Sequence, residues 1–327
     1  MHFQALSIGA LVPTHHFNGT VHSVFHQACN LRLDSHALLT LLLSNQANLP
    51  NGIRIDAASQ PSFLNLIRVG QPVACRGGIL RIGEAGFSID LRTARSWRID
   101  LKGVSIDLSQ PSQARAWAVA WSELNRSARK SGLSRTIIDL YSCSRQPLGD
   151  SAALECFMPS SGHAVPALLQ ATRNVQADTA KTSLRPLIGL GPGLTPSGDD
   201  FLVGYLAGLW STTDNSPLRD TILAALDREL SETARTTTDI SCTYLRSAAQ
   251  GHVSEPMAKL ARRLKHANDI ASVRTAAQVA LQVGHTSGTD GVLGLLLGCL
   301  PWQRHASHLV FGDLLDGSVD MSAILCS

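Results

Sequence analysis

Two glycine-rich segments, each followed by an apolar run, carry the residues best suited to chemistry in this 327-residue sequence. The first reads GLGPGLTPSGDDFLVG over residues 189–204, and the second reads GHTSGTDGVLGLLLG over residues 284–298. Both contain the pattern Ser-Gly-x-Asp-x-apolar-apolar-Gly, which begins at Ser197 in one and at Ser287 in the other. We expect two loop–helix units whose helix starts meet at one site.

The loops could offer a ligand two kinds of group. Glycine allows positive φ angles and close backbone approach, and the first N–H groups of a helix can bind an anion. Asp199 and Asp200 follow in the first segment. An ionised carboxylate there would accept hydrogen bonds from a ligand NH2 group or bind a divalent cation. A ligand with an anionic end and an NH2 end would use both.

Two alternatives stay open from the motifs alone. Ser197 with Asp200, and Ser287 with Asp290, fit an acidic variant of the capping box. Paired carboxylates could also hold Mg²⁺ with a nucleotide, which would make the protein a phosphotransferase. The segments nevertheless match neither the phosphate-binding loop that ends in Gly-Lys nor the dinucleotide-binding glycine pattern.

Both apolar runs contain further glycines four residues apart, Gly204 and Gly208 in the first and Gly294 and Gly298 in the second. Small residues at this spacing let two helices approach each other closely. Among other candidates, Lys181 and Arg185 precede the first loop and could supply positive charge to an oxyanion. Four N-terminal histidines match no zinc-ligand spacing: His15, His16, His22 and His26.

The elements that must position the loops fall into two parts. Residues 1–110 contain short apolar stretches separated by turn signals such as Asn51-Gly52. Gly19–Leu33 and Ile79–Leu91 partly alternate between apolar and polar residues, which is typical of half-buried strands. Leu38–Leu43 is apolar throughout, so periodicity does not assign it. We expect a β-rich domain, a small barrel or sandwich, over residues 1–110.

Helical spacing replaces this alternation from Pro111 onward. Six segments show it: 112–130, 165–175, 217–233, 240–250, 256–266 and 272–283. We therefore expect residues 111–327 to form a mainly α-helical domain that carries both loops, within an α+β protein.

Composition narrows the class of protein. Charged residues make up 16% of the chain, the mean hydropathy is +0.06 and the net charge is +3. The sequence has no basic stripe of the kind that binds nucleic acid and no apolar run of the ~20 residues that span a membrane. Its first residues lack a basic start and a long apolar stretch, so we expect no signal peptide. Its seven cysteines are scattered without a CxxC pair, which indicates a reduced, cytoplasmic protein.

The segment 189–204 resembles the signature of the AllH family, which includes a subunit of bacterial oxamate carbamoyltransferase. Residues 236–251 and 284–294 match the same family, and the N-terminal segments 19–33 and 49–56 are similar to it. One departure is that threonine occupies position 286, where the family pattern has serine. The resemblance touches most of the chain and is weakest beyond residue 300.

The resemblance implies a role in the breakdown of allantoin and purines. The reaction would be phosphorolysis of oxalurate to oxamate and carbamoyl phosphate, or its reverse. The resemblance also implies two partner subunits, one like AllF (FdrA-like) and one like AllG, so this chain alone need not be active. A third interpretation, beside the carbamoyltransferase and the phosphotransferase, is a non-catalytic ligand-binding or assembly subunit.

For carbamoyl transfer, we expect catalytic residues in both loops: Asp199, Asp200, His285 and Asp290. The small anionic substrate, which would be phosphate, carbamoyl phosphate or an oxalurate-like compound, would contact backbone and hydroxyl groups of eight residues: Gly191, Gly193, Leu194, Thr195, Ser197, Gly198, Ser287 and Gly288. Such groups can stabilise the charged state through which the carbamoyl carbon passes. No residue is assigned as a metal ligand, and Mg²⁺ enters only with the phosphotransferase.

Overall fold

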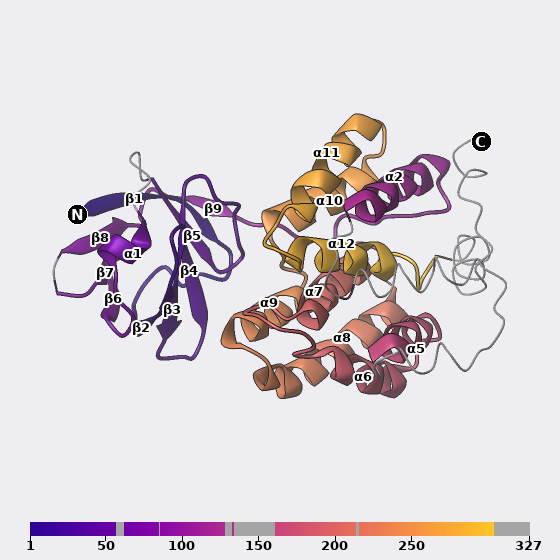
Figure 1. Ribbon diagram of the computed structural model, residues 1–327, viewed down its shortest axis with the longest axis horizontal. Helices are drawn as coiled ribbons and strands as arrows, with labels where there is room; N and C mark the ends of the chain where they lie inside the picture. The colour runs from indigo at the N-terminus through magenta and orange to yellow at the C-terminus, as the bar shows by residue number, and fades with distance from the viewer. Residues whose placement is uncertain (57–61, 85, 128–132, 134–160, 214–215, 304–327) are drawn as a thin grey trace. The chain divides into compact units, whose positions relative to one another are not determined.

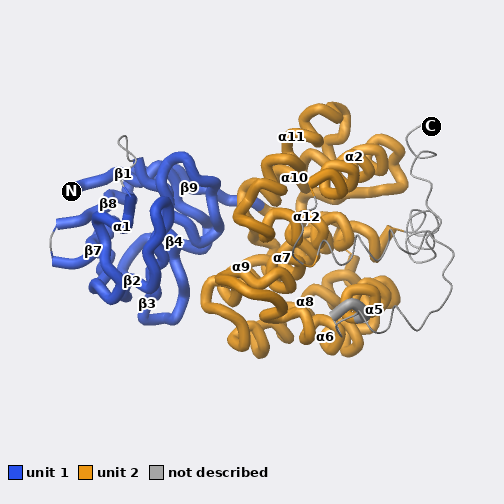
Figure 2. The backbone as a smooth tube through the Cα atoms, in the orientation of Figure 1, with its two compact units in different colours: residues 1–99 blue, residues 100–327 orange. Residues whose placement is uncertain are grey.

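The computed structural model describes residues 1–56, 62–84, 86–127, 133, 161–213 and 216–303. The chain divides into two compact units, residues 1–99 and residues 100–327 (Figure 2). Within the described ranges, no helix is both long and apolar enough to cross a membrane. Four cysteines are free there: Cys29, Cys75, Cys242 and Cys299. The remaining three lie outside those ranges: Cys143, Cys156 and Cys326.

The first unit is a β-barrel with a short helix, α1 (Phe63–Leu66) (Figure 1). Its strands are β1 (His2–Gly9), β2 (Phe17–Val24), β3 (Ala28–Leu33), β4 (Leu38–Leu43), β5 (Gly52–Asp56), β6 (Pro72–Arg76), β7 (Ile79–Ile82), β8 (Phe87–Asp90) and β9 (Arg95–Trp97). The order β5-β4-β3-β2-β6-β7-β8-β1 closes on itself because β1 also pairs with β5. Strand β9 pairs with the end of β1. The predicted β-rich N-terminal part is confirmed, in its barrel form.

The sequence pattern explains most of these strands. The alternating segment Gly19–Leu33 forms the antiparallel pair β2–β3, with Gly19 opposite Leu33. The segment Ile79–Leu91 likewise supplies β7 and β8. The unassigned run Leu38–Leu43 is β4, and all its residues are buried. A strand that is buried on both faces has no polar side to alternate with, which is why its periodicity was uninformative.

The second unit is helical, as predicted. It contains the helices α2 (Pro111–Ser127), α5 (Ser161–Arg173), α6 (Ala177–Leu184), α7 (Ser197–Trp210), α8 (Pro217–Thr233), α9 (Asp239–Ala249), α10 (Glu255–Lys265), α11 (Ile270–Leu281) and α12 (Ser287–Gly298), and the 3-10 helices η1 (Arg185–Leu187) and η2 (Ala234–Thr236). The six predicted helical segments correspond to α2, α5, α8, α9, α10 and α11. The last predicted residues of the first segment, 128–130, lie outside the described ranges.

Helices α7 and α12 lie side by side within this unit, and α2, α10 and α11 pack against α12 (Figure 1). Helix α9 packs against α7. Nearly every residue of α12 is buried, and α7 is almost as deeply enclosed. A helix that is apolar all round is stable only when neighbours cover every face. The two apolar runs that follow the loops therefore form the centre of the helical unit.

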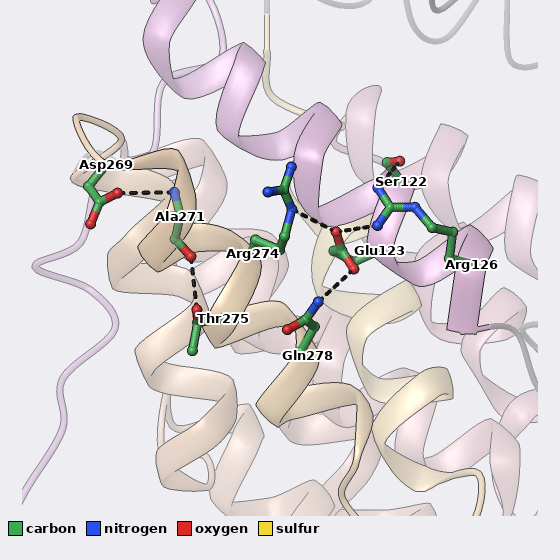
Figure 3. A network of polar contacts seen from close by, with 8 residues as sticks. All are labelled: Ser122, Glu123, Arg126, Asp269, Ala271, Arg274, Thr275 and Gln278. Atoms are coloured by element: carbon green, nitrogen blue, oxygen red, sulfur yellow. Dashed lines mark hydrogen bonds and ion pairs between the residues drawn. The ribbon is translucent and has the colours of Figure 1, made fainter.

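A buried carboxylate ties α2 to α11 (Figure 3). The Glu123 side chain is 3% exposed, and its Oε1 accepts hydrogen bonds from Arg126 Nη1 at 2.7 Å and from Arg274 Nε at 3.0 Å. Its Oε2 accepts one from Gln278 Nε2 at 3.1 Å. Both carboxylate oxygens are thus satisfied, as a buried charge requires.

Candidate functional site

The glycines of α7 and α12 bring the two helix backbones into contact. A Cβ atom at Gly204 would lie 1.9 Å from the carbonyl oxygen of Gly291, and one at Gly294 would lie 2.0 Å from that of Phe201. Gly208 faces Gly298 further along. Residues near the start of α7 face residues near the start of α12, and later residues face later ones. The helices therefore run parallel, and their N-termini lie at the same end. The expected close approach of the two helices is confirmed.

Side chains join the two helix starts directly. Thr195, in the loop before α7, lies with its Oγ1 atom 2.8 Å from the Oγ atom of Ser287, the first residue of α12. Either hydroxyl can donate this hydrogen bond. Two segments far apart in the sequence therefore share one polar cluster, which consists of Thr195, Asp200, Ser287 and Asp290 and is called the carboxyl cluster below.

The capping-box alternative is wrong for both helices. The N-cap residues are Pro196 for α7 and Thr286 for α12, and neither makes a side-chain cap hydrogen bond. Ser197 and Ser287 are instead the first helical residues. The repeated serine therefore does not start the helix in the way that a capping serine does.

Asp199 holds the first loop in place. Its Oδ1 accepts a hydrogen bond from the N–H of Gly189 at 2.8 Å, and its Oδ2 accepts one from Thr237 Oγ1 at 2.5 Å. The side chain is almost fully buried, and this burial raises its pKa, against the opposing effect of the hydrogen bonds. With a protein partner on each oxygen, Asp199 holds the first loop against the residues before α9.

Asp200 is different because one of its oxygens has no partner. Its Oδ2 atom is buried and accepts no hydrogen bond, while the hydroxyls of Ser287 and Thr195 bond to the carboxyl group. The pKa of Asp200 is raised to about 7, mainly by burial and to a lesser extent by the nearby charges of Asp290 and Asp199, against the lowering effect of the two hydroxyls. A carboxyl group that titrates near neutral pH can both take up and release a proton.

The other predicted residues of α12 take different positions. Asp290 is fully buried in the first turn, and its charge acts on Asp200. Thr289, which the sequence did not single out, has a buried Oγ1 without a hydrogen-bond partner. His285 is exposed in the loop that precedes the helix. The structure thus brings Asp290 to the carboxyl cluster and leaves His285 at the surface.

The loop glycines shape the backbone, yet two of the expected N–H donors are already used. Gly191 and Gly193 adopt φ angles of 108° and 102°, which favour glycine. The N–H of Gly198 donates to the carbonyl of Leu190 at 2.9 Å, and that of Gly288 donates to Val283 at 2.8 Å. An anion would compete with these internal hydrogen bonds. Leu194, also predicted to contact substrate, is 54% exposed.

A third segment, the threonine run before α9, also contacts the first loop. Thr237 binds Asp199, and Thr238 Oγ1 donates to the carbonyl of Leu194 at 2.6 Å while accepting the N–H of Ser241 as the N-cap of α9. The run of three threonines before α9 was the available signal. The start of α9 therefore fixes the first glycine loop from a second direction.

The two basic residues before the loop serve other partners. Arg185 forms a bidentate contact with Glu229, through Nε at 2.5 Å and Nη2 at 3.2 Å. Lys181 pairs with Asp178 at 2.7 Å. The expectation that they supply charge to an oxyanion thus finds no support in these contacts.

The carboxyl cluster offers few protein ligands to a bound metal ion. In the described part of the chain, no group of three or more His, Cys, Asp or Glu side chains could hold a metal ion. Mg²⁺ often uses only one or two carboxylates and takes its other oxygens from substrate phosphates and water. A magnesium ion at the carboxyl cluster would therefore depend on the substrate for most of its ligands.

Comparison with known families gives two matches. The family described as "Oxamate carbamoyltransferase subunit AllH" matches residues 187–299, a range that includes both glycine loops, α7 and α12. The "AllH family N-terminal domain" matches residues 4–99, which comprise nearly all of the barrel unit. No solved structure matches the chain.

Proposed function

Since the chain belongs to the AllH family, we propose that it acts as a subunit of a carbamoyltransferase that moves a carbamoyl group between oxalurate and phosphate. In the phosphorolytic direction, a phosphate oxygen forms a bond to the carbamoyl carbon. The bond from that carbon to the oxamate nitrogen breaks. The products are carbamoyl phosphate and oxamate, and the proton of hydrogen phosphate moves to the oxamate nitrogen, so atoms and charge balance.

The observation that carries this proposal is the buried, unpartnered Oδ2 of Asp200 beside two hydroxyls from different segments. In its ionised form this oxygen accepts an N–H of the carbamoyl group or the proton of phosphate. In its protonated form it delivers the proton to the leaving nitrogen. A pKa near 7 lets one group perform both steps at neutral pH.

The neighbouring residues have supporting roles in this proposal. Burial keeps the pKa of Asp200 high, with a smaller contribution from the charge of Asp290, and Asp199 fixes the loop that carries Thr195. The hydroxyls of Thr195 and Ser287 orient the Asp200 carboxyl group. Backbone groups at Gly191, Gly193 and Leu194 and at the starts of α7 and α12 contact the anionic part of the substrate, with His285 at the entrance. Holding phosphate and oxalurate together supplies much of the acceleration.

The family description calls its member a subunit, so we place this chain in a multisubunit enzyme. The proposed partners are an AllF-like and an AllG-like subunit, the setting is allantoin breakdown, and the compartment is the cytoplasm. Activity is therefore to be measured on the assembled complex.

A thermal-shift screen of the full-length chain tests the function. Ligands that bind the native state raise the melting temperature by an amount that grows with the logarithm of ligand concentration over Kd. We expect oxalurate, oxamate or carbamoyl phosphate to stabilise the chain, and the Asp200→Asn variant to respond less. A response to Mg-ATP alone would reject the carbamoyltransferase in favour of a phosphotransferase. No response, together with tight co-purification with the partners, would reject a catalytic role in favour of an assembly subunit.

A further inference from the structure

The barrel unit has a cavity of its own, apart from the carboxyl cluster. Its volume is about 590 Å³, which lies in the ordinary range of small-molecule sites. It is lined by the end of β1 and the loop that follows, by the β6–β7 turn, and by the chain from the end of β8 through β9: Ile8, Gly9, Ala10, Val12, Thr14, His15, Gly77, Gly78, Leu91, Arg92, Ala94, Ser96 and Arg98. Every lining residue belongs to the first unit, so the cavity is defined without reference to the second.

Small residues keep this cavity open. Gly77 and Gly78 form a turn at φ angles of 54° and 77°, and a Cβ atom at Gly77 would meet no atom within 4 Å. At Gly78 the space is taken by Arg92, whose Cγ would lie 2.6 Å from such a Cβ. The glycine turn thus leaves room above Gly77 and lets the Arg92 stem cross over Gly78.

The lining is basic and carries no acidic side chain. Arg92 is neutralised from outside the lining, since its Nε and Nη2 donate to Asp90 at 3.0 Å and 2.6 Å and hold the pKa of Asp90 at about 2. Arg98 is exposed and makes no ion pair with any residue that the structure describes. It therefore leaves a positive charge without an ion pair in a lining that also contains two hydroxyl residues, Thr14 and Ser96.

We propose that this cavity, called the barrel pocket below, binds the oxyanion group of a small molecule, a carboxylate or a phosphate. The planar guanidinium of Arg98 offers paired N–H donors to two such oxygens, and hydroxyls complete the contacts. The proposal does not depend on the carbamoyltransferase function.

Calorimetric titration of the full-length chain with oxalate, and separately with inorganic phosphate, tests the barrel pocket. We expect one probe or both to bind, and the arm that binds identifies the oxyanion. Arg98→Gln weakens binding at least tenfold, and Ser96→Phe, which fills the cavity, abolishes it. Arg81→Gln removes an exposed arginine of β7 outside the lining and leaves binding unchanged.

Three results would overturn the barrel pocket. One is no heat from either probe, and another is equal loss of affinity in Arg81→Gln and Arg98→Gln. The third is loss of binding in Asp200→Asn with full binding in Arg98→Gln, which would move the anion to the carboxyl cluster. Failure of the carbamoyltransferase assay, by contrast, leaves these titrations unaffected.

Discussion

The carboxyl cluster lies inside the helical unit, whereas the arginines of the barrel pocket are exposed on the barrel unit. Asp200 and Asp290 put two acids of like charge in a buried place, and the pKa of Asp200 rises to about 7. Arg92 and Arg98 keep their charges in contact with water. Burial therefore converts a carboxylate into a proton carrier, while exposure leaves the charge of Arg98, which Asp90 does not neutralise as it does Arg92, available to an anion.

Glycine also serves the two regions in different ways. In α7 and α12 it is needed because a neighbouring backbone occupies the place of a Cβ atom. At Gly77 the place is empty, and glycine is needed only for its positive φ angle. The first requirement is steric and the second conformational, so substitutions should differ in cost. The predictions below test both contrasts.

The largest effect is expected from Gly204→Val. The added side chain would collide with the carbonyl of Gly291 and force α7 away from α12, at a cost of about 3 kcal/mol or more. Urea unfolding, monitored by circular dichroism, measures the loss. Gly103→Ala is the control in the same unit, because a Cβ atom there meets nothing within 4 Å. Equal stability of the two variants would contradict the close helix packing.

Asp200→Asn should lower the turnover of the assembled complex by about a hundredfold or more, the usual contribution of a proton-transferring group. Release of oxamate from oxalurate and phosphate provides the assay. Asp178→Asn is the matched control, since that carboxylate is 95% exposed on α6. Turnover close to that of the unmodified complex would remove Asp200 from the chemistry.

The same substitution should change how stability depends on pH. Asp200 has a folded-state pKa raised to about 7, above its usual value of 3.8, so between these pH values the native state holds the proton more tightly. Its contribution is therefore favourable at low pH and is lost as the pH rises toward 7. We expect Asp200→Asn to gain stability relative to the unmodified protein as the pH rises through this window, by up to about 1.4 kcal/mol per pH unit.

Glu123 provides the opposing control for that measurement. Its carboxylate oxygens accept hydrogen bonds from two arginines and a glutamine, so Glu123→Gln should destabilise the chain at neutral pH (Figure 3). Unfolding free energies at several pH values distinguish the two. A difference curve for Asp200→Asn that is flat from pH 4 to pH 7 would show that its pKa is not raised.

The smallest effect is expected from Gly77→Ala. Its Cβ atom would enter open space, and only the positive φ angle of 54° carries a cost, of about 1 kcal/mol. Denaturant unfolding alongside Gly204→Val gives the comparison. A loss as large as that of Gly204→Val would mean that the β6–β7 turn is packed and that the space over the barrel pocket is closed.

Much of the secondary structure could be read from periodicity. The strands β2, β3, β7 and β8 and six helices show the apolar–polar periodicity of elements with one buried face and one solvent-exposed face. Periodicity did not predict β4, because both of its faces are buried and it lacks the polar positions that define a period. For the candidate site, the repeated pattern correctly paired the loop before α7 with the loop before α12.

The sequence by itself determined the repeat, its glycines and its acidic residues, because these are local features of the chain. Only the tertiary structure decided their roles. Asp199 and Asp200 are adjacent in sequence, yet both oxygens of Asp199 accept hydrogen bonds, from Gly189 and Thr237, whereas Oδ2 of Asp200 has no partner. The barrel pocket likewise joins three separate stretches of chain. Hydrogen-bond partners and desolvation depend on distant residues, and a sequence pattern does not record those contacts.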